Sequence, residues 1–313
     1  MSKTIVSIVQ ASPVFMNLNA SVTRAVGLIE QAWRKGAKLI AFGETWLPGY
    51  PAWLDHSPHA ALWNHEPTRE VFAQLRRNSV VVPGKETETL GEVARELGVV
   101  VVIGVNERVD EGAGNGTLYN SLLTFGADGT LLNHHRKLVP TYTERLVWGQ
   151  GDAAGLEAVT TSAGRVGGLV CWEHWMPLAR QAMHTSGEHI HVAVFPTVHE
   201  MHQIASRHYA FEGRCFVLAA GLLMKAGDLP AGLTPASELV NTPEKFLLRG
   251  GSCIIAPDGS YVVEPVFDEE LVITAELDLT LIDKEKMTLD VTGHYFRPDV
   301  FNLEVNRGTR RMA

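Results

Sequence analysis

The apolar run Val99-Val100-Val101-Val102-Ile103 is continuous, with no polar residue at alternate positions. A strand with one face in solvent alternates between apolar and polar side chains, whereas an unbroken run of β-branched residues is typical of a strand covered on both faces. Other elements must therefore pack on both sides of this strand. The run predicts an α/β protein.

Similar short apolar runs recur on either side of it, and stretches of helical period separate them. The runs expected to be strands are Ile5–Val9, Leu39–Phe42, Val99–Val105, Val166–Val170, His191–Phe195 and Cys215–Ala219. One helix is expected over Val22–Trp33, where apolar residues recur at i, i+3, i+4 and i+7 before Gly36. A second is expected over Leu90–Leu97, ended by Gly98.

Two segments with Asp-Gly between apolar runs interrupt this alternation. Phe125–Leu132 contains Asp128-Gly129, and Ile255–Val262 contains Asp258-Gly259. Asp-Gly favours the two-residue turn of a β-hairpin, so each segment predicts an antiparallel pair. The sheets are therefore expected to be mixed.

The whole chain, residues 1–313, is expected to form a single domain. Residues 225–244 are rich in Pro and Gly and could be a linker, but the strands and loops expected after them cannot bury their faces without the earlier helices. We therefore interpret 225–244 as a surface insertion and 294–313 as a C-terminal segment of the same domain.

The composition disfavours several classes of protein. The 313 residues are 45% hydrophobic and carry a formal net charge of −8 without a cluster of Lys or Arg, which argues against disorder, nucleic-acid binding and membrane-surface binding. No uncharged apolar run approaches the roughly 20 residues that a membrane span requires. The three cysteines are too few for a disulfide framework, so a reducing, cytoplasmic location is expected.

Cys171 is the first candidate for a reactive group. It follows the run Val166–Val170 and precedes the helical stretch Leu178–Thr185. A strand that delivers a cysteine into such a turn presents the sulfur, and the first helical amides can stabilise developing negative charge. The alternative is a small buried apolar side chain, which is the commoner state of a free cysteine and our interpretation of Cys215 and Cys253.

Two charged residues follow other expected strands. Glu44 comes after the run Leu39–Phe42, and Lys137 comes after the strand that completes the first hairpin. Catalytic groups of α/β proteins commonly lie where a strand opens into a loop. Either residue alone could be a solvated charge, but a thiol, a carboxylate and an ammonium are chemically complementary.

Three blocks of sequence resemble the carbon–nitrogen hydrolase (nitrilase) superfamily and, within it, the nitrilase branch. They are Phe42–Pro51, His135–Arg145 and Gly168–His174, which contains Cys171-Trp172-Glu173-His174, and they occur in the family's order. The similarity extends to Gly293–Asp299. It implies a four-layer αββα sandwich with two mixed β-sheets, and a homodimer or higher homo-oligomer in which sandwiches pack together.

The same resemblance implies the roles of the site residues. Cys171 would be the nucleophile, Glu44 the general base, and Lys137 the cation that stabilises charge on the substrate. Glu144 would pair with Lys137, because one cation cannot neutralise two carboxylates and a thiolate in one place. A nitrile and water are the expected partners, with no metal or organic cofactor.

Aromatic residues near these blocks are expected to line the substrate pocket, since apolar walls suit a neutral nitrile. The candidates favoured by family position are Tyr50, Trp148, Trp172 and Phe195, and Trp53, Thr141, Tyr142 and His199 lie in or near the same blocks. Core packing is the alternative for each of them.

The expected reaction is hydrolysis of an organic nitrile to the carboxylic acid and ammonia through a thioimidate and a thioester on Cys171. An amidase or a cyanide-hydrolysing enzyme is the nearest alternative, because the same groups would serve it. A non-catalytic assembly scaffold is the alternative from a different class. Such a scaffold would be expected to have lost Glu44, Lys137 or Cys171, and the chain has all three.

Overall fold

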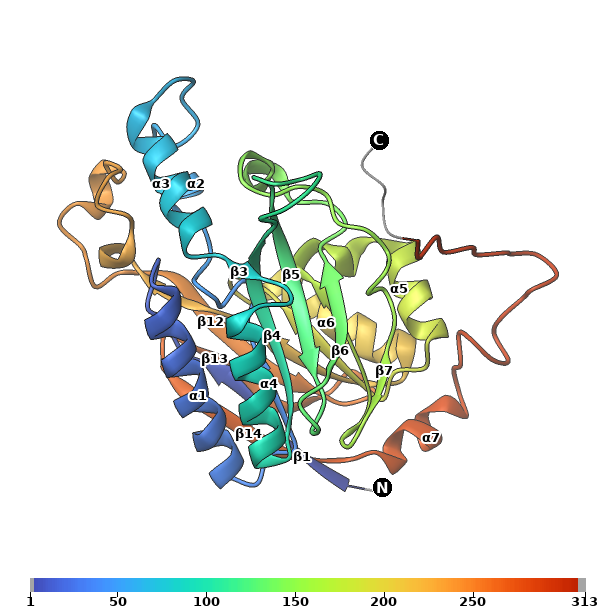
Figure 1. Cartoon of the computed structure of the whole chain (residues 1–313). Helices are drawn as coiled ribbons and strands as arrows, with labels where there is room; N and C mark the ends of the chain where they lie inside the picture. Colours follow the sequence, from blue (N-terminus) through green and yellow to red (C-terminus); the bar gives the residue numbers. More distant parts are fainter. Residues whose placement is uncertain (1–2, 309–313) are drawn as a thin grey trace.

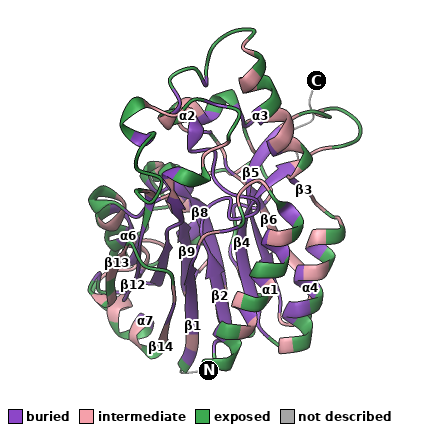
Figure 2. Ribbon diagram, turned by 90° about the vertical axis from the view of Figure 1, so that its left-hand side faces the viewer, coloured by how far each residue is buried: buried purple, intermediate pink, exposed green. Residues whose placement is uncertain are grey.

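The structure of the chain is a computed structural model that describes residues 3–308. Two mixed β-sheets lie face to face, and helices pack on the outer side of each, giving four layers in the order helix, sheet, sheet, helix (Figure 1). Figure 2 shows the buried strands between helices whose outer faces are exposed. The predicted αββα sandwich with two mixed sheets is confirmed.

The first sheet has the strand order β14-β1-β2-β4-β5-β6, with β3 paired to β4. Its strands are β1 (Lys3–Gln10), β2 (Leu39–Phe42), β3 (Val80–Val81), β4 (Val100–Arg108), β5 (Leu118–Phe125), β6 (Leu131–Arg136) and β14 (Leu271–Asp278). The strands β1, β2 and β4 run parallel, whereas β14, β5 and β6 pair in antiparallel fashion. The first predicted hairpin is the pair β5–β6.

The second sheet has the order β11-β12-β10-β9-β8-β7, with β13 paired to β12. Its strands are β7 (Val159–Thr161), β8 (Gly164–Val170), β9 (Ile190–Val194), β10 (Phe216–Ala220), β11 (Leu223–Lys225), β12 (Phe246–Ile255) and β13 (Tyr261–Phe267). A parallel centre, β8-β9-β10, is flanked by antiparallel neighbours. The second predicted hairpin is the pair β12–β13.

The helices cover the two outer faces and extend from one end of the sandwich (Figure 1). They are α1 (Leu18–Arg34), α2 (Trp53–His56), α3 (Glu66–Arg77), α4 (Lys85–Leu97), α5 (Pro177–Thr185), α6 (Glu200–Gly213) and α7 (Thr280–Lys286), with short 3-10 turns η1 (Tyr142–Leu146), η2 (Cys171–Trp175), η3 (Ala226–Asp228) and η4 (Ser237–Leu239). Helices α1 and α4 pack against the first sheet, and α6 packs against the second.

Local chemistry explains where the predicted helices begin and end. The side chain of Asn17 accepts a hydrogen bond from the Ala20 amide at 3.1 Å, which caps the start of α1. Helix α4 ends at Gly98, whose φ of 62° lies in the left-handed region that glycine adopts without a Cβ clash. Both helices predicted from apolar spacing are confirmed, although each begins earlier than its apolar pattern.

Apolar side chains fill the space between the sheets. Ile8 and Val102 of the first sheet and Val192 and Leu218 of the second belong to one cluster of fully buried residues. Each such side chain contributes roughly 1.5–3 kcal/mol relative to an exposed one. This core holds the ends of β2, β6 and β8 in place, and these strands lead into Glu44, Lys137 and Cys171.

The two segments outside the regular layers have different surroundings. Residues 225–244 lie between the antiparallel strands β11 and β12, and the Ala236 amide donates a hydrogen bond to the His56 carbonyl at 2.8 Å. Residues 288–308, the end of the described chain, form no helix or strand. Residues 309–313 of the predicted C-terminal segment, and residues 1–2, lie outside the described residues. The single-domain organisation stays a prediction.

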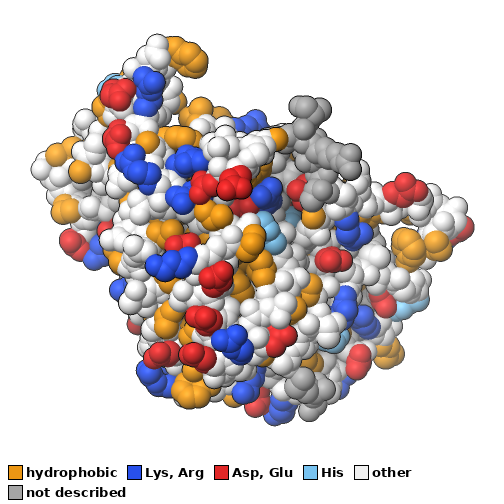
Figure 3. Space-filling view, viewed as in Figure 1, with side chains coloured by type: hydrophobic (Ala, Val, Ile, Leu, Met, Phe, Trp, Pro, Cys, Tyr) orange, Lys and Arg blue, Asp and Glu red, His pale blue; other side chains and the backbone are white. Residues whose placement is uncertain are grey.

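Two expectations concerned the surface: that the chain has no membrane span and that it has no cluster of Lys or Arg. None of the helices formed by residues 3–308 is long and apolar enough to cross a bilayer. On the face shown in Figure 3, acidic and basic side chains are interspersed.

Candidate active site

Cys171 lies at the turn between β8 and the 3-10 turn η2. Its φ of 53° is uncommon for a residue with a side chain, and such strained positions are concentrated at functional sites. The Trp172 amide lies close enough to the sulfur to lower the pKa of the thiol, and the Cys171 carbonyl accepts a hydrogen bond from His174 Nδ1 at 2.7 Å. The turn therefore fixes the backbone of Cys171 and places an amide near its sulfur.

Glu44 follows the buried end of β2 and is itself fully buried. Its Oε1 accepts hydrogen bonds from Asn120 Nδ2 at 2.6 Å and from Lys137 Nζ at 3.1 Å. Its Oε2 has no hydrogen-bond partner among residues 3–308. Burial, only partly offset by the Lys137 charge, raises the pKa of Glu44 to about 7.

Lys137 follows β6 and points between two carboxylates. Its Nζ lies 2.6 Å from Glu144 Oε2 as well as 3.1 Å from Glu44 Oε1. Burial alone would lower the pKa of Lys137, but the charges of Glu44, Cys171 and Glu144 raise it above the ordinary value. Lys137 is therefore a permanent cation at neutral pH.

Glu144, on η1, is held by other donors besides Lys137. Its Oε2 accepts from the Thr141 amide at 2.6 Å, and its Oε1 accepts from the Tyr50 hydroxyl at 2.9 Å. Of the four oxygens of Glu44 and Glu144, Glu44 Oε2 is therefore the one left without a partner within the described chain.

The thiol of Cys171 shares this charged environment. Burial, reinforced by the Glu44 carboxylate, raises the pKa of Cys171 well above its ordinary value, and Lys137 only partly opposes this. The resting sulfur is therefore protonated at neutral pH, so a base must take its proton before the sulfur can attack. The carboxylate with a pKa near 7 and an unoccupied oxygen is Glu44.

Cys171 opens onto a cavity of about 540 Å³. Its wall combines apolar groups such as Leu247 and Leu248 with polar groups such as Thr197 and His199. It also includes Thr141 and Tyr142 among the wider set of candidates from the sequence.

The structure separates the four aromatic candidates. Tyr50 and Trp172 line the cavity with Glu144 and Cys171. Trp148 packs behind Tyr50, with ring centroids 5.7 Å apart, and its Nε1 donates to Asn106 Oδ1 at 2.8 Å. Phe195 is fully buried and its ring centroid lies 4.7 Å from that of His202, which does line the cavity. Direct substrate contact by Trp148 and Phe195 stays a prediction, and their positions favour a supporting role.

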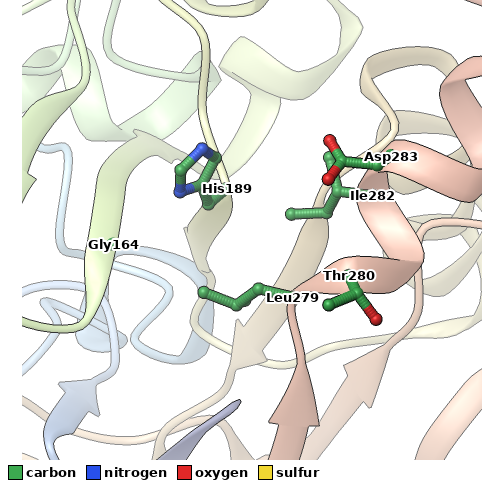
Figure 4. A pocket seen from close by; sticks show the side chains of 6 residues that line it. All are labelled: Gly164, His189, Leu279, Thr280, Ile282 and Asp283. Atoms are coloured by element: carbon green, nitrogen blue, oxygen red, sulfur yellow. The ribbon is translucent and has the colours of Figure 1, made fainter. Parts of the chain in front are cut away.

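A second, smaller cavity of about 210 Å³ lies at the opposite end of β8 (Figure 4). Gly164 at the start of that strand lines it, together with His189 and residues of α7. Glu44, Lys137 and Cys171 lie where β2, β6 and β8 end, so the chemistry belongs to the larger cavity.

Two residues of the site were not predicted from the sequence. Asn120, on β5, orients Glu44. Glu173 accepts hydrogen bonds from the amide that follows Lys137 and from the amide that precedes Cys171. Asn120 lies outside the runs that were expected to be strands, and Glu173 appeared only as part of the block Gly168–His174, so the sequence indicated no partner for either side chain. Among residues 3–308, no group of three or more His, Cys, Asp or Glu side chains could hold a metal ion.

Comparisons with known proteins point to one family. A sequence profile of the carbon–nitrogen hydrolase family matches residues 5–286. "Nitrilase 2" from an unknown prokaryotic organism is 43% identical over 305 residues, which cover 97% of this chain and 92% of that protein. "Aliphatic nitrilase" from Sinorhizobium fredii is 39% identical over 308 residues, which cover 98% of this chain and 96% of that protein.

Solved structures of lower identity share the fold. A carbon–nitrogen hydrolase from Helicobacter pylori G27 matches with a TM-score of 0.67 at 20% identity and covers 91% of this chain and 93% of that one. Nit3 from Saccharomyces cerevisiae, a member of branch 10 of the nitrilase superfamily, matches with a TM-score of 0.69 at 20% identity, covering 94% and 97% of the two chains.

Proposed function

Because this chain belongs to the carbon–nitrogen hydrolase family, we propose that it is a nitrilase that converts an organic nitrile and two waters into a carboxylic acid and ammonia. The observation that carries the proposal is the arrangement around Glu44. Its Oε2 has no hydrogen-bond partner among residues 3–308, whereas Lys137 and Asn120 both donate to its Oε1. A base oriented in this way can take the Cys171 proton.

In the first half of the reaction, Glu44 takes the thiol proton as the sulfur attacks the nitrile carbon and passes it to the nitrile nitrogen, giving a thioimidate. Lys137 stabilises the charge that develops on the nitrogen. Glu44 then takes a proton from a water that adds to the thioimidate carbon. Both protons of this water end on the nitrogen, the carbon–nitrogen bond breaks, and ammonia leaves. The product of this half is a thioester on Cys171.

In the second half, another water attacks the thioester carbonyl and Glu44 accepts its proton. The Trp172 amide and Lys137 are the donors available to the tetrahedral oxyanion. The carbon–sulfur bond breaks, the acid is released, and the proton returns to the sulfur. Since Cys171 and Glu44 both have raised pKa values, they hold one proton between them in the resting enzyme.

The direct test is an assay of the purified chain on aliphatic, aromatic and arylacetic nitriles, each with its matching amide. We expect acid and ammonia in equal amounts from at least one nitrile. Turnover of amides without turnover of any nitrile would instead identify an amidase.

Substitution of Glu144 by Gln is expected to lower kcat by more than about 10-fold, because Lys137 would lose the ion pair that fixes its ammonium. The change keeps the size of the side chain, so the fold should persist. Ammonia release measured at saturating nitrile checks this, with Tyr50→Phe as a milder comparison because it removes only the hydroxyl that Glu144 Oε1 accepts from. An unchanged kcat in Glu144→Gln would remove Glu144 from the mechanism.

We further propose that the chain forms a homodimer or a larger homo-oligomer through helices α5 and α6. Large apolar side chains on these helices are exposed, including Leu178, Met201, Ile204 and Phe211. Covering them would remove apolar surface from water. Light scattering should give at least twice the monomer mass, and Leu178→Asp should lower it; a monomeric wild-type chain would contradict the proposal.

We also place the protein in the cytoplasm. Its three cysteines are all free and buried, which suits a reducing compartment.

A further inference from the structure

Glu173 is a buried acid close to the catalytic residues, and the proposed reaction gives it no role. It lies two residues after Cys171, on the turn η2, with 1% of its surface exposed. Its Oε1 accepts a hydrogen bond from the Leu138 amide at 2.8 Å, and its Oε2 accepts one from the Val170 amide at 2.7 Å. His135 Nε2 lies 2.9 Å from Oε2 and 3.1 Å from Oε1.

The two backbone partners flank the residues that the reaction uses. Leu138 directly follows Lys137, and Val170 directly precedes Cys171. Lys137 extends from β6 in the first sheet, whereas Cys171 extends from β8 in the second. A single carboxylate therefore joins the ends of two strands that belong to different sheets.

The surroundings of Glu173 favour the ionised form of its carboxylate. Burial opposes ionisation, but the charge and hydrogen bond of His135 and the two backbone amides hold the pKa of Glu173 below its ordinary value. Burial likewise opposes protonation of His135, but Glu173 raises the pKa of His135 above its ordinary value. Three donors thus converge on an ionised carboxylate.

We infer that Glu173 is a positioning residue, which sets the separation between the Cys171 sulfur and the Lys137 ammonium through the backbone on either side of them. It does not touch the substrate. The inference rests on the proposed function, since it assumes that sulfur and ammonium act on one substrate. The strained backbone of Cys171, with its φ of 53°, makes such a restraint necessary, because a relaxed turn would aim the sulfur elsewhere.

Glutamine at position 173 is the informative substitution. It keeps the shape of the side chain but replaces one acceptor oxygen with an NH₂ donor, so either the Leu138 amide or the Val170 amide must face a donor. One of the two strand ends would then shift. We expect kcat per active site to fall at least about 10-fold with KM changed less than about 3-fold, because misplacement affects the transition state more than binding.

Glu107→Gln is the matched control. Glu107 is also 1% exposed and accepts from three side chains: the Arg136 guanidinium, His134 Nε2 at 2.7 Å and Ser121 Oγ at 2.6 Å. Unlike Glu173, it accepts from neither of the backbone amides of Leu138 and Val170. Loss of a buried charge should lower the melting temperature of both variants. Only Glu173→Gln should lower kcat per active site, where the number of active sites is measured by alkylation of Cys171.

The rate of Cys171 alkylation by iodoacetamide against pH gives a readout that needs no substrate. If the ammonium moves away from the sulfur, the thiolate is stabilised less, and the midpoint of the profile should move to higher pH by about 0.5 or more. Glu173→Asp keeps two acceptor oxygens and should regain at least about 3-fold of the lost kcat. Should Glu173→Gln not fold, the midpoint measured on Glu173→Asp should move in the same direction by a smaller amount.

Wild-type kcat per active site in Glu173→Gln together with an unmoved alkylation midpoint would overturn the inference. An equal loss of kcat per active site in Glu107→Gln would also overturn it, since the effect would then come from general loosening. If the wild-type chain turned over no nitrile but the midpoint still moved, the proposed function would fail and the positioning role would stand.

Discussion

Ammonia release from a nitrile is expected to fall by at least about 10⁴-fold when Cys171 is replaced by alanine, because removal of a nucleophile leaves no covalent route. The remaining groups can polarise the nitrile but cannot form the thioimidate. Removal of one buried sulfur atom should cost only about 1 kcal/mol of stability. Steady-state ammonia assays and a thermal unfolding curve measure the two effects separately.

Cys253→Ala is the control for this substitution. Cys253 is fully buried, on β12, and burial raises its pKa to about 12, so it has the burial of Cys171 without the neighbouring base and cation. Its alanine variant should lose a comparable amount of stability and keep its turnover per folded molecule. A Cys171→Ala enzyme that released ammonia at near-normal rates would end the proposed mechanism.

Glu44→Gln is expected to lower kcat by about 10²- to 10⁴-fold, the usual contribution of a general base. Glutamine can still accept from Asn120 and Lys137 through its oxygen, so the geometry around Oε1 should survive. Its amide nitrogen would occupy the position of the unpartnered Oε2 and could not accept the thiol proton. Each of the protons that the mechanism passes to Glu44, from the thiol and from the two waters, would lose its acceptor.

The pH dependence of the wild-type enzyme provides a separate check on Glu44. The base works only when ionised, and its pKa is raised to about 7. The value of kcat/KM should therefore be low below about pH 7, where the carboxylate is protonated, and should rise as pH increases through about 7. The apparent pKa of this rising limb of the pH profile belongs to Glu44 and Cys171 together, because the two residues share the proton. Glu44→Gln should remove this limb from its residual activity. A wild-type profile that is flat from pH 5 to 8, or a limb retained in Glu44→Gln, would assign the proton to another group.

Much of the fold could be predicted because its causes are local. The continuous valine run became the buried strand β4, the two Asp-Gly segments became the hairpins β5–β6 and β12–β13, and Gly98 ended α4. Each pattern reflects an interaction between residues close together in the chain, such as a turn conformation or one apolar face of a helix. The same patterns placed Glu44, Lys137 and Cys171 after strands.

The contacts of the site could not be predicted in this way. That Glu44 offers a free oxygen depends on Asn120 and Lys137 approaching from β5 and β6, and nothing near Glu44 in the sequence indicates those partners. The ring of Trp148 packs on Tyr50 and the ring of Phe195 packs on His202, and the sequence could not predict these neighbours, because strand pairing and ring packing decide which face of a segment meets the cavity.

The sequence by itself therefore determined the α/β class, the hairpins and the candidate chemistry, since apolar periodicity, turn residues and strand-end charges act over a few residues. Only the tertiary structure decided which carboxylate oxygen is free, which aromatic rings reach the cavity, and that Glu173 joins the ends of β6 and β8. The physical reason is that hydrogen-bond geometry between two sheets depends on how residues far apart in the chain pack, to within a fraction of an ångström.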